Sequence, residues 1–312
     1  MSHPRRFRFG VQASGPTDAA GWISLARRAE ELGYSTLSMA DHFDDDLAVV
    51  PTLATVAAAT TELRIGSLVF ANDFRHPALL AKEAATLDVL SGGRLELGVG
   101  AGWQTTDYEH TGIPLDPAGV RIDRLGEAIE VVNSLFGPDP VTYDGAHYRI
   151  EGLVGRPSPV QSPRPPVLVG GGGRRILTLA GRLADIVGVN PNLAAGVIDD
   201  RAGPSATADA TRCKLAWVRE GAGDRFDDLE LQTRVHIAAI TDDRDGLART
   251  LAPVLGIDAT EALASPHAVA GTVEECIDHL RRVRDDHGIS YITWGSDSLE
   301  SMAPIVEALA GS

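Results

Sequence analysis

The sequence predicts an α/β protein of the (β/α)8 TIM-barrel class, folded as a single domain over residues 1–312 with insertions at about 138–165 and 191–230. Short β-branched or apolar runs alternate with helical patterns along the chain, which is typical of repeated βα units around a parallel sheet. Eight such runs occur, and eight parallel strands close a barrel. A length of 312 residues is common for an α/β barrel that forms one domain.

The first half of the chain contains four βα units. The predicted strands are FRFGVQ (7–12), STLSMA (35–40), LRIGSLVF (63–70) and RLELGVG (94–100). Apolar side chains at helical spacing follow the first strand from Trp22 to Leu32, and Gly33 is placed to end that helix. The same spacing from Ile122 to Val132 predicts the fourth helix.

The βα rhythm is interrupted twice in the second half. VTYDGAHYRI predicts a hairpin around Asp144 and Gly145, and a proline-rich connection completes the insertion at about 138–165. Residues 191–230 contain a Gly/Pro/Ser/Ala-rich stretch followed by a predicted helix. Because this connection is longer than an ordinary βα loop, we expect either a functional cover or a disordered segment there. The remaining strands are predicted at VLVG (167–170), DIVGVN (185–190), ELQTRVHIAAI (230–240) and SYITWG (290–295), before a closing helix from Met302 to Leu309.

Charge and cysteine content exclude several classes of partner. The chain has 28 basic and 43 acidic residues, a formal net charge of -15 that repels nucleic acids and anionic membrane surfaces. Cys213 and Cys276 form neither a metal-spaced pair nor a disulfide framework. Because no export signal or membrane span is visible either, we expect a cytoplasmic protein.

Catalytic residues of such barrels lie at the carboxyl ends of the strands. This rule selects residues 40–43, 69–76, 100–110, 170–175 and Asn190.

A glycine loop follows the fifth predicted strand. Four glycines and two arginines stand there between a strand and a helix, where unhindered N–H groups and the positive helix end can hold a phosphate. The alternative is a flexible turn chosen for close packing. We predict that the cofactor phosphate is bound by Gly170, Gly171, Gly172, Gly173 and Arg174.

The second strand ends in Asp41, His42 and Phe43. A carboxylate beside an imidazole is a common way to place a proton donor or acceptor that works near neutral pH. We therefore predict His42 and Asp41 as catalytic residues, with His42 as the chief acid/base group and Phe43 in the substrate pocket. The alternative is that the pair serves only capping and turn formation.

The run from Gly98 to Trp103 (GVGAGW) imitates a dinucleotide-binding fingerprint. Its sixth position is Trp and a barrel surrounds it, so we reject a Rossmann interpretation. Small residues allow the chain to turn at the barrel mouth, and Trp103 is expected to face the substrate pocket.

Several catalytic motifs do not occur. The sequence contains no H-x-H, H-E-x-x-H, G-x-S-x-G or P-loop motif and no carboxylate cluster with metal spacing, so we expect no metal. A mouth for a phosphorylated cofactor with few ionisable groups suits hydride transfer, in which the cofactor carries the reactive atom.

With these motifs the chain resembles the bacterial luciferase-like monooxygenase superfamily, and within it the oxidoreductases that depend on the deazaflavin coenzyme F-420. The resemblance spans nearly the whole chain. It rests on ADHF (40–43), RIGSLVF and the residues after it (64–94), LGVGAGW (97–103) and VLVGGGGRRILTLAGRLADIV (167–187).

The resemblance implies how the cofactor is held. In the family, a bulge with a non-prolyl cis peptide on the third strand supports the flavin or deazaflavin ring, and by position this role falls on Leu68 and Val69. The family's glycine loop holds the phosphate, which is expected against the N–H groups of Gly171 to Gly173. A bulky β-branched residue in place of Gly172 is expected to weaken cofactor binding and leave the fold largely intact.

The resemblance also bears on the proton donor. The Asp-His pair of the deazaflavin branch meets the cofactor and assists proton transfer, which matches Asp41 and His42. Sugar-phosphate dehydrogenases of the family carry a glutamate where this chain has Trp103, so a sugar-phosphate substrate is not expected. Glu109 matches a glutamate that is common in the wider family.

The expected function is hydride transfer between coenzyme F-420 and a small organic substrate. One alternative is an FMN-dependent monooxygenase that uses molecular oxygen, and another is a barrel that binds a cofactor without turnover. The intact Asp41-His42 pair and glycine loop argue against the non-catalytic barrel. The resemblance further implies a homodimer.

Overall fold

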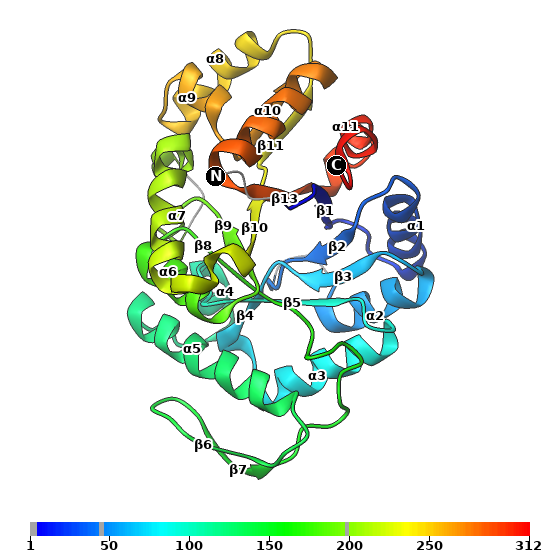
Figure 1. The fold of residues 1–312 in the computed structure, drawn as a ribbon, viewed down its shortest axis with the longest axis vertical. Helices are drawn as coiled ribbons and strands as arrows, with labels where there is room; N and C mark the ends of the chain where they lie inside the picture. Colours follow the sequence, from blue (N-terminus) through cyan, green and yellow to red (C-terminus); the bar gives the residue numbers. More distant parts are fainter. Residues whose placement is uncertain (1–4, 44–46, 197–199) are drawn as a thin grey trace.

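The computed structural model describes residues 5–43, 47–196 and 200–312. Its main sheet has the strand order β3-β2-β1-β13-β10-β9-β8-β5-β4, and β3 also pairs with β5, so that the sheet closes on itself (Figure 1). Every pairing in this sheet is parallel. The predicted parallel barrel is therefore confirmed.

The barrel strands overlap the eight predicted runs, although the seventh run continues beyond its strand. They are β1 (Arg8–Gln12), β2 (Thr36–Met39), β3 (Arg64–Ser67) with its continuation β4 (Phe70–Ala71), β5 (Leu95–Gly100), β8 (Val167–Gly171), β9 (Ile186–Val189), β10 (Glu230–Arg234) and β13 (Ile289–Gly295). Leu68 and Val69 separate β3 from β4, and the peptide bond between them is cis, as predicted.

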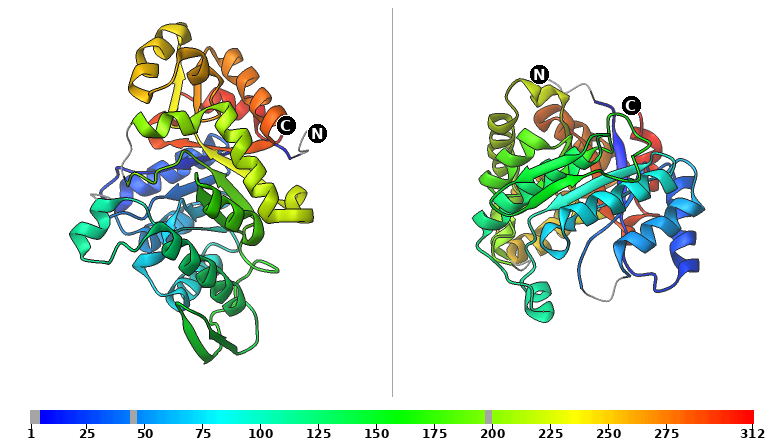
Figure 2. Two further views of the ribbon diagram at one scale, coloured as in Figure 1. Left: turned by 90° about the vertical axis from the view of Figure 1, so that its left-hand side faces the viewer. Right: turned by 90° about the horizontal axis from the view of Figure 1, so that it is seen from below.

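Helices form the outer layer of the barrel (Figure 2). They are α1 (Ala19–Glu31), α2 (Val49–Ala59), α3 (Pro77–Leu90), α4 (Thr105–Thr111), α5 (Ala118–Leu135), α6 (Arg174–Leu183), α7 (Ala208–Ala222), α10 (Val273–His287) and α11 (Ala303–Leu309). Their apolar stripes face the strands, as shown by the complete burial of Ala26, Leu53 and Leu125. The chain ends beside its first strand, where the N–H of Phe7 donates to the carbonyl of Ser312.

The two predicted insertions have different outcomes. β6 (Val141–Asp144) and β7 (Arg149–Leu153) form the expected antiparallel hairpin, which projects from the barrel in Figure 1. Within 191–230 the predicted helix is α7, which packs on α6 and belongs to the outer layer. Only the segment before α7 lies outside the βα repeat, and it contains the short 3-10 helix η2 (Asp200–Ala206).

The predicted seventh strand is two strands. After β10 the chain leaves the main sheet, and β11 (Ile237–Ile240) pairs with β12 (Ala268–Gly271) in a separate two-stranded sheet. Helices α8 (Arg244–Leu255) and α9 (Ala259–Ala264) connect these two strands. At the break the N–H of Val235 donates to Thr293 and that of His236 donates to His267. No Gly or Pro stands between the two strands, so the sequence does not mark the change of sheet.

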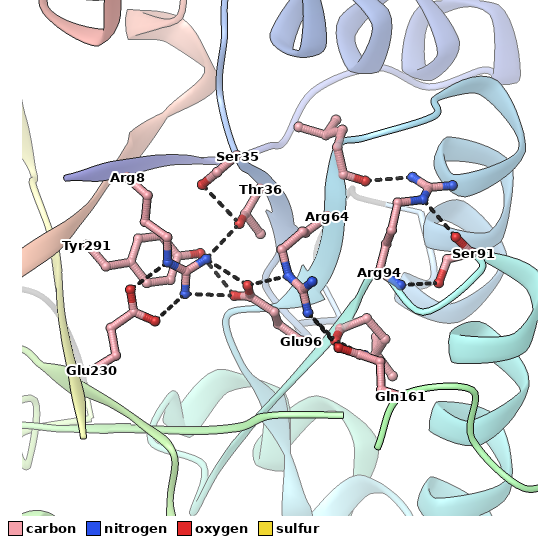
Figure 3. A network of polar contacts seen from close by, with 12 residues as sticks. Arg8, Ser35, Thr36, Arg64, Ser91, Arg94, Glu96, Gln161, Glu230 and Tyr291 are labelled. Carbon is pink, nitrogen blue, oxygen red and sulfur yellow. Dashed lines mark hydrogen bonds and ion pairs between the residues drawn. The ribbon is translucent and has the colours of Figure 1, made fainter. Parts of the chain in front are cut away.

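An ion-pair network occupies the amino-terminal end of the barrel (Figure 3). The guanidinium of Arg8 donates to Glu96 and to Glu230 at 2.6 Å each and lies 3.6 Å from the ring centre of Tyr291. Arg64 donates to Glu96 at 2.7 Å. Burial would raise the pKa of Glu96, but the two guanidinium groups lower it below its usual value. The network closes the end of the barrel that is opposite to the catalytic mouth.

A small apolar cluster lies inside the barrel. Leu168, Ile186 and Tyr291 are buried there, and Leu68 and Val69 pack against them. This cluster lies between the ion-pair network and the cis peptide, so the open end of the barrel begins at the level of Leu68.

Candidate functional site

His42 and Asp107 meet at the carboxyl-terminal end of the strands. His42 follows β2, and its Nδ1 lies 2.7 Å from Oδ2 of Asp107 in α4. The other carboxylate oxygen of Asp107 accepts the N–H of Phe43 at 3.1 Å. Asp107 is only 4% exposed, so a buried carboxylate holds the imidazole in one orientation.

Hydrogen bonds of nearby residues anchor α4 and the loop before it. The hydroxyl of Tyr108 donates to Asp73 at 3.0 Å, and Asp73 also accepts Nε of Arg124 at 2.9 Å. Burial and the carboxylate of Asp73 raise the pKa of Tyr108 well above its usual value, so this hydroxyl remains a donor. Arg121 donates to the carbonyls of Ala101 and Gly102, which ties the loop after β5 to α5.

Asp41 does not contact His42 through a hydrogen bond in the described part of the chain. Its carboxylate pairs with Arg75 through two bonds of 2.8 and 3.0 Å and accepts the N–H of Ala71 at 3.0 Å. Asp41 therefore joins the end of β2 to the segment after β4. The sequence predicts Asp41 as the carboxylate beside His42, whereas in the structure the carboxylate that contacts the imidazole is that of Asp107.

Aromatic side chains line the mouth around His42. The ring of Trp103 meets that of His42 edge-on with their centres 5.7 Å apart. Phe43 packs on Phe74 at 4.8 Å and is 54% exposed, which places it at the rim. Of the two residues predicted for the substrate pocket, Trp103 packs against His42 and Phe43 follows it in the sequence.

The glycine loop joins β8 to α6, as expected. No described residue accepts a hydrogen bond from the N–H groups of Gly172, Gly173 or Arg174. These groups stand at the positive end of α6, a helix whose first residue follows Gly173. The backbone of the loop is therefore free to bind an anion.

Two glycines of this loop differ in the space around them. A Cβ atom on Gly172 would lie 2.3 Å from the carbonyl oxygen of Pro191, whereas a Cβ on Gly173 would meet nothing within 4 Å. The expectation that a bulky residue at Gly172 leaves the fold intact is therefore wrong, because rigid backbone blocks the space. The motif showed four equivalent glycines and gave no sign of this neighbour.

Arg174 lies on the surface of α6. Its guanidinium pairs with Glu220 of α7 at 3.0 Å, and the neighbouring Arg175 pairs with Asp123 of α5 at 2.6 Å. Both arginine side chains are more than half exposed. In this arrangement the charge that faces an anion comes from the backbone and the helix end, and the Arg174 side chain is engaged elsewhere.

A chain of hydrogen bonds that the sequence did not reveal crosses the mouth. Nε2 of Gln12 donates to the carbonyl of Leu68 at 2.8 Å, and Nε of Arg234 donates to Oε1 of Gln12 at 2.7 Å. The N–H of Arg234 also donates to the side chain of Asn190 at 3.3 Å. Arg234 escaped notice because the predicted strand ran to residue 240, which moved its carboxyl end away from Arg234.

Glu109 lies on the exposed side of α4, two residues beyond Asp107. Asp107 falls within the range that the strand-end rule selected, but no motif distinguished it from Glu109.

Within residues 5–43, 47–196 and 200–312, no cluster of His, Cys, Asp and Glu side chains is suited to a metal ion. No helix in the same ranges has the length and apolar character needed to cross a membrane.

The chain is similar in sequence to two kinds of oxidoreductase. The chain is 33% identical over 190 residues to an F-420-dependent glucose-6-phosphate dehydrogenase of Microbacterium testaceum, a match that covers 57% of this chain and only about half, 55%, of that relative. It is 30% identical over 234 residues to an FMNH2-dependent dimethylsulfone monooxygenase of Pseudomonas putida, which covers 68% of this chain and 64% of that protein.

The fold is similar to that of the coenzyme F-420-dependent tetrahydromethanopterin reductase from Methanopyrus kandleri, with a TM-score of 0.78 over 98% of this chain and 100% of that one. Their sequence identity of 19% limits this likeness to the fold. The model of the luciferase-like monooxygenase family matches residues 4–203, more than half of the chain. The chain therefore belongs to the luciferase-like monooxygenase family of α/β-barrel oxidoreductases.

Proposed function

We propose that this protein moves a hydride between coenzyme F-420 and a small organic substrate. The observation that carries the proposal is the contact of 2.7 Å between His42 and the buried Asp107 at the barrel mouth, an imidazole prepared for proton transfer. The similarity to an F-420-dependent dehydrogenase supports the choice of cofactor.

The residues at the mouth fit a phosphorylated deazaflavin. The N–H groups of Gly172 and Gly173 are suited to its phosphate, and the open space over Gly173 leaves room for it. Leu68 and Val69 offer an apolar surface for its ring system. When bound there, the deazaflavin supplies the atom that accepts or donates the hydride.

His42 manages the proton of the reaction. Its Nδ1 is held by Asp107, which leaves Nε2 to contact the oxygen of the substrate. In an oxidation, Nε2 takes the proton of a substrate hydroxyl, and in a reduction it returns a proton to the carbonyl oxygen. Asp107 stabilises the imidazolium that exists between these events, because its carboxylate lies 2.7 Å from Nδ1.

The surroundings of His42 favour an uncharged substrate. Trp103 and Phe43 present aromatic surface on the side where the substrate would approach. Trp103 also occupies the position at which sugar-phosphate dehydrogenases of the family carry a glutamate. We therefore propose a small alcohol, carbonyl or related organic compound as the substrate, in place of a sugar phosphate.

An FMN-dependent monooxygenase is the second candidate function. It is favoured by the 30% identity to the dimethylsulfone monooxygenase of Pseudomonas putida. The glycine loop would hold the phosphate of FMN by the same backbone groups, so the loop does not discriminate between the two cofactors.

Two turnover assays test the proposal on the purified full chain. In the first, reduced F-420 is mixed without oxygen with a panel of small ketones, aldehydes and unsaturated carbonyl compounds, and the return of the oxidised deazaflavin absorbance is followed. In the second, reduced FMN is mixed in air with organic sulfur compounds and alkanes, and oxygenated products are measured. The proposal expects turnover in the first assay, while oxygen-dependent turnover confined to the second would establish the monooxygenase.

A further inference from the structure

Lys214 is a buried cation close to the proposed cofactor site. The chain contains two lysines, and Lys214 in α7 is 2% exposed whereas Lys82 in α3 is exposed. Burial lowers the pKa of Lys214 to about 8, and no carboxylate of the described residues forms an ion pair with it. A buried ammonium group is costly unless its donors are bonded, so the partners of Lys214 indicate what it does.

The bonds of Lys214 close one segment of chain. Its Nζ donates to the carbonyl of Asn190 at 2.7 Å and also to the carbonyl of Ser205. These two carbonyls stand at the two ends of the stretch that leads from β9 to α7. Oγ of Ser205 additionally accepts the N–H of Asn192 at 2.7 Å. We call residues 191–196 and 200–205 the cover segment.

The cover segment forms one wall of the glycine loop. The N–H of Asn190 donates to the carbonyl of Gly171 at 2.9 Å, which fixes the start of the segment to the loop. Backbone atoms of Pro191 and Asn192 fill the space where a Cβ of Gly172 would lie, at 2.3 and 2.6 Å. Further along, the carbonyl of Gly196 accepts the N–H of Thr105, the first residue of α4. The cover segment therefore contacts both the glycine loop and the helix that carries Asp107.

We propose that Lys214 is a positioning residue for the glycine loop, because its ammonium group holds the cover segment against Gly172 and so keeps the loop N–H groups directed at the phosphate of the cofactor. Lys214 acts through Asn190 and Pro191 and does not itself touch the phosphate. This proposal rests on one part of the proposed function, namely that the glycine loop binds the phosphate of the cofactor.

A lysine suits this task better than an arginine. Its compact ammonium group directs donors to two carbonyls from a single atom, whereas a planar guanidinium is matched to a bidentate partner such as a carboxylate. His267 interacts electrostatically with Lys214, and its pKa is lowered to about 3, mainly by burial and in part by Lys214. His267 is therefore neutral at pH 7, and the ammonium of Lys214 adds positive potential behind the loop.

The test compares ligands with and without a phosphate. The affinities of the full-length protein for FMN and riboflavin are measured by fluorescence quenching, and the pair of F-420 and its phosphate-free deazariboflavin chromophore is measured in the same way. Within each pair, the affinity for the phosphorylated ligand divided by the affinity for the phosphate-free ligand reports how well the loop holds the phosphate. We expect Lys214→Met to reduce this ratio by about tenfold and to leave the affinity for the phosphate-free ligands unchanged.

Control variants separate this role from a general effect on stability. Lys82→Met removes the exposed lysine and is expected to leave the ratio unchanged. Ser205→Ala removes the bond from Asn192 and keeps Lys214, so it is expected to reduce the ratio by a smaller factor even where Lys214→Met folds poorly.

Two results would overturn the proposal, and they are distinguishable. An unchanged ratio in both Lys214→Met and Ser205→Ala, next to a clear phosphate preference of the wild type, contradicts the role of Lys214 alone. Equal affinity of the wild type for ligands with and without phosphate contradicts the glycine-loop site itself, and the role of Lys214 with it.

Discussion

His42 and Asp107 are 65 residues apart in the sequence, and their side chains meet through Nδ1 and Oδ2 at 2.7 Å. The imidazole comes from the segment after β2 and the carboxylate from the helix after β5, and both of these strands pair with β3, so the barrel brings the two segments close together. The same carboxylate also accepts the N–H of Phe43, which fixes the loop that carries His42. The pair is therefore oriented before any substrate arrives.

Replacement of His42 by alanine is expected to damage turnover more than binding. A general acid/base group contributes about 10²- to 10⁴-fold to the rate, so kcat falls by that factor while cofactor affinity stays near normal. Steady-state kinetics together with a fluorescence titration of the cofactor measure both quantities. Normal kcat with lost cofactor binding would make His42 a binding residue.

Asp107→Asn is expected to reduce kcat by about 10- to 100-fold, because the amide no longer stabilises the imidazolium and can hold the wrong tautomer. The matched control is Glu109→Gln, which removes an exposed carboxylate from the same helix and is expected to leave kcat unchanged. Equal effects of the two variants would show that Asp107 acts only through the charge of α4.

The glycine loop predicts opposite behaviour for two neighbouring positions. Gly173→Val places its side chain in open space, so the protein folds while the side chain obstructs the phosphate, and affinity for a phosphorylated cofactor falls about tenfold or more. Gly172→Val meets the backbone of Pro191 and is expected to lower the melting temperature markedly. Thermal unfolding followed by circular dichroism, and cofactor titration of Gly173→Val, measure these effects. A stable Gly172→Val protein would contradict the described packing of Pro191.

The ion-pair network at the barrel floor predicts a pH-dependent contribution to stability. The pKa of Glu96 is lowered in the folded protein, so its stabilisation is complete above its unfolded pKa of about 4.3 and is lost as the pH falls through the lower folded value. Glu96→Gln leaves two guanidinium groups without this carboxylate and is expected to cost about 3 kcal/mol at pH 7. Urea unfolding at about pH 7 and pH 3 should show that the difference from wild type narrows in acid. A difference that stays constant between these pH values would refute the electrostatic origin.

The barrel could be predicted because its strands are short apolar runs with a helix after each, a local pattern. The break between β10 and β11 could not, because no turn residue separates the two strands, and only the hydrogen-bond acceptors change, from Thr293 for Val235 to His267 for His236. Tertiary pairing of this kind leaves no local signal in a single sequence.

The site shows the same limit. Motifs and strand ends mark His42, Trp103 and the glycine loop, so the sequence is enough to select them as candidates. The sequence does not single out Asp107 and Lys214, because their contacts depend on where helices α4 and α7 pack, which no local pattern specifies. Asp41 was paired with His42 by adjacency, although successive residues of an extended chain point in opposite directions, and its carboxylate reaches Arg75.

The choice of cofactor is the central claim, and an anaerobic titration tests it most directly. The purified full chain is titrated separately with reduced F-420 and with reduced FMN, and binding is followed by the change in absorbance or fluorescence of each cofactor. The proposal predicts saturable binding of reduced F-420 with a dissociation constant at least about tenfold lower than that of reduced FMN. Tighter binding of reduced FMN, followed on admission of oxygen by a flavin-oxygen adduct, would contradict it.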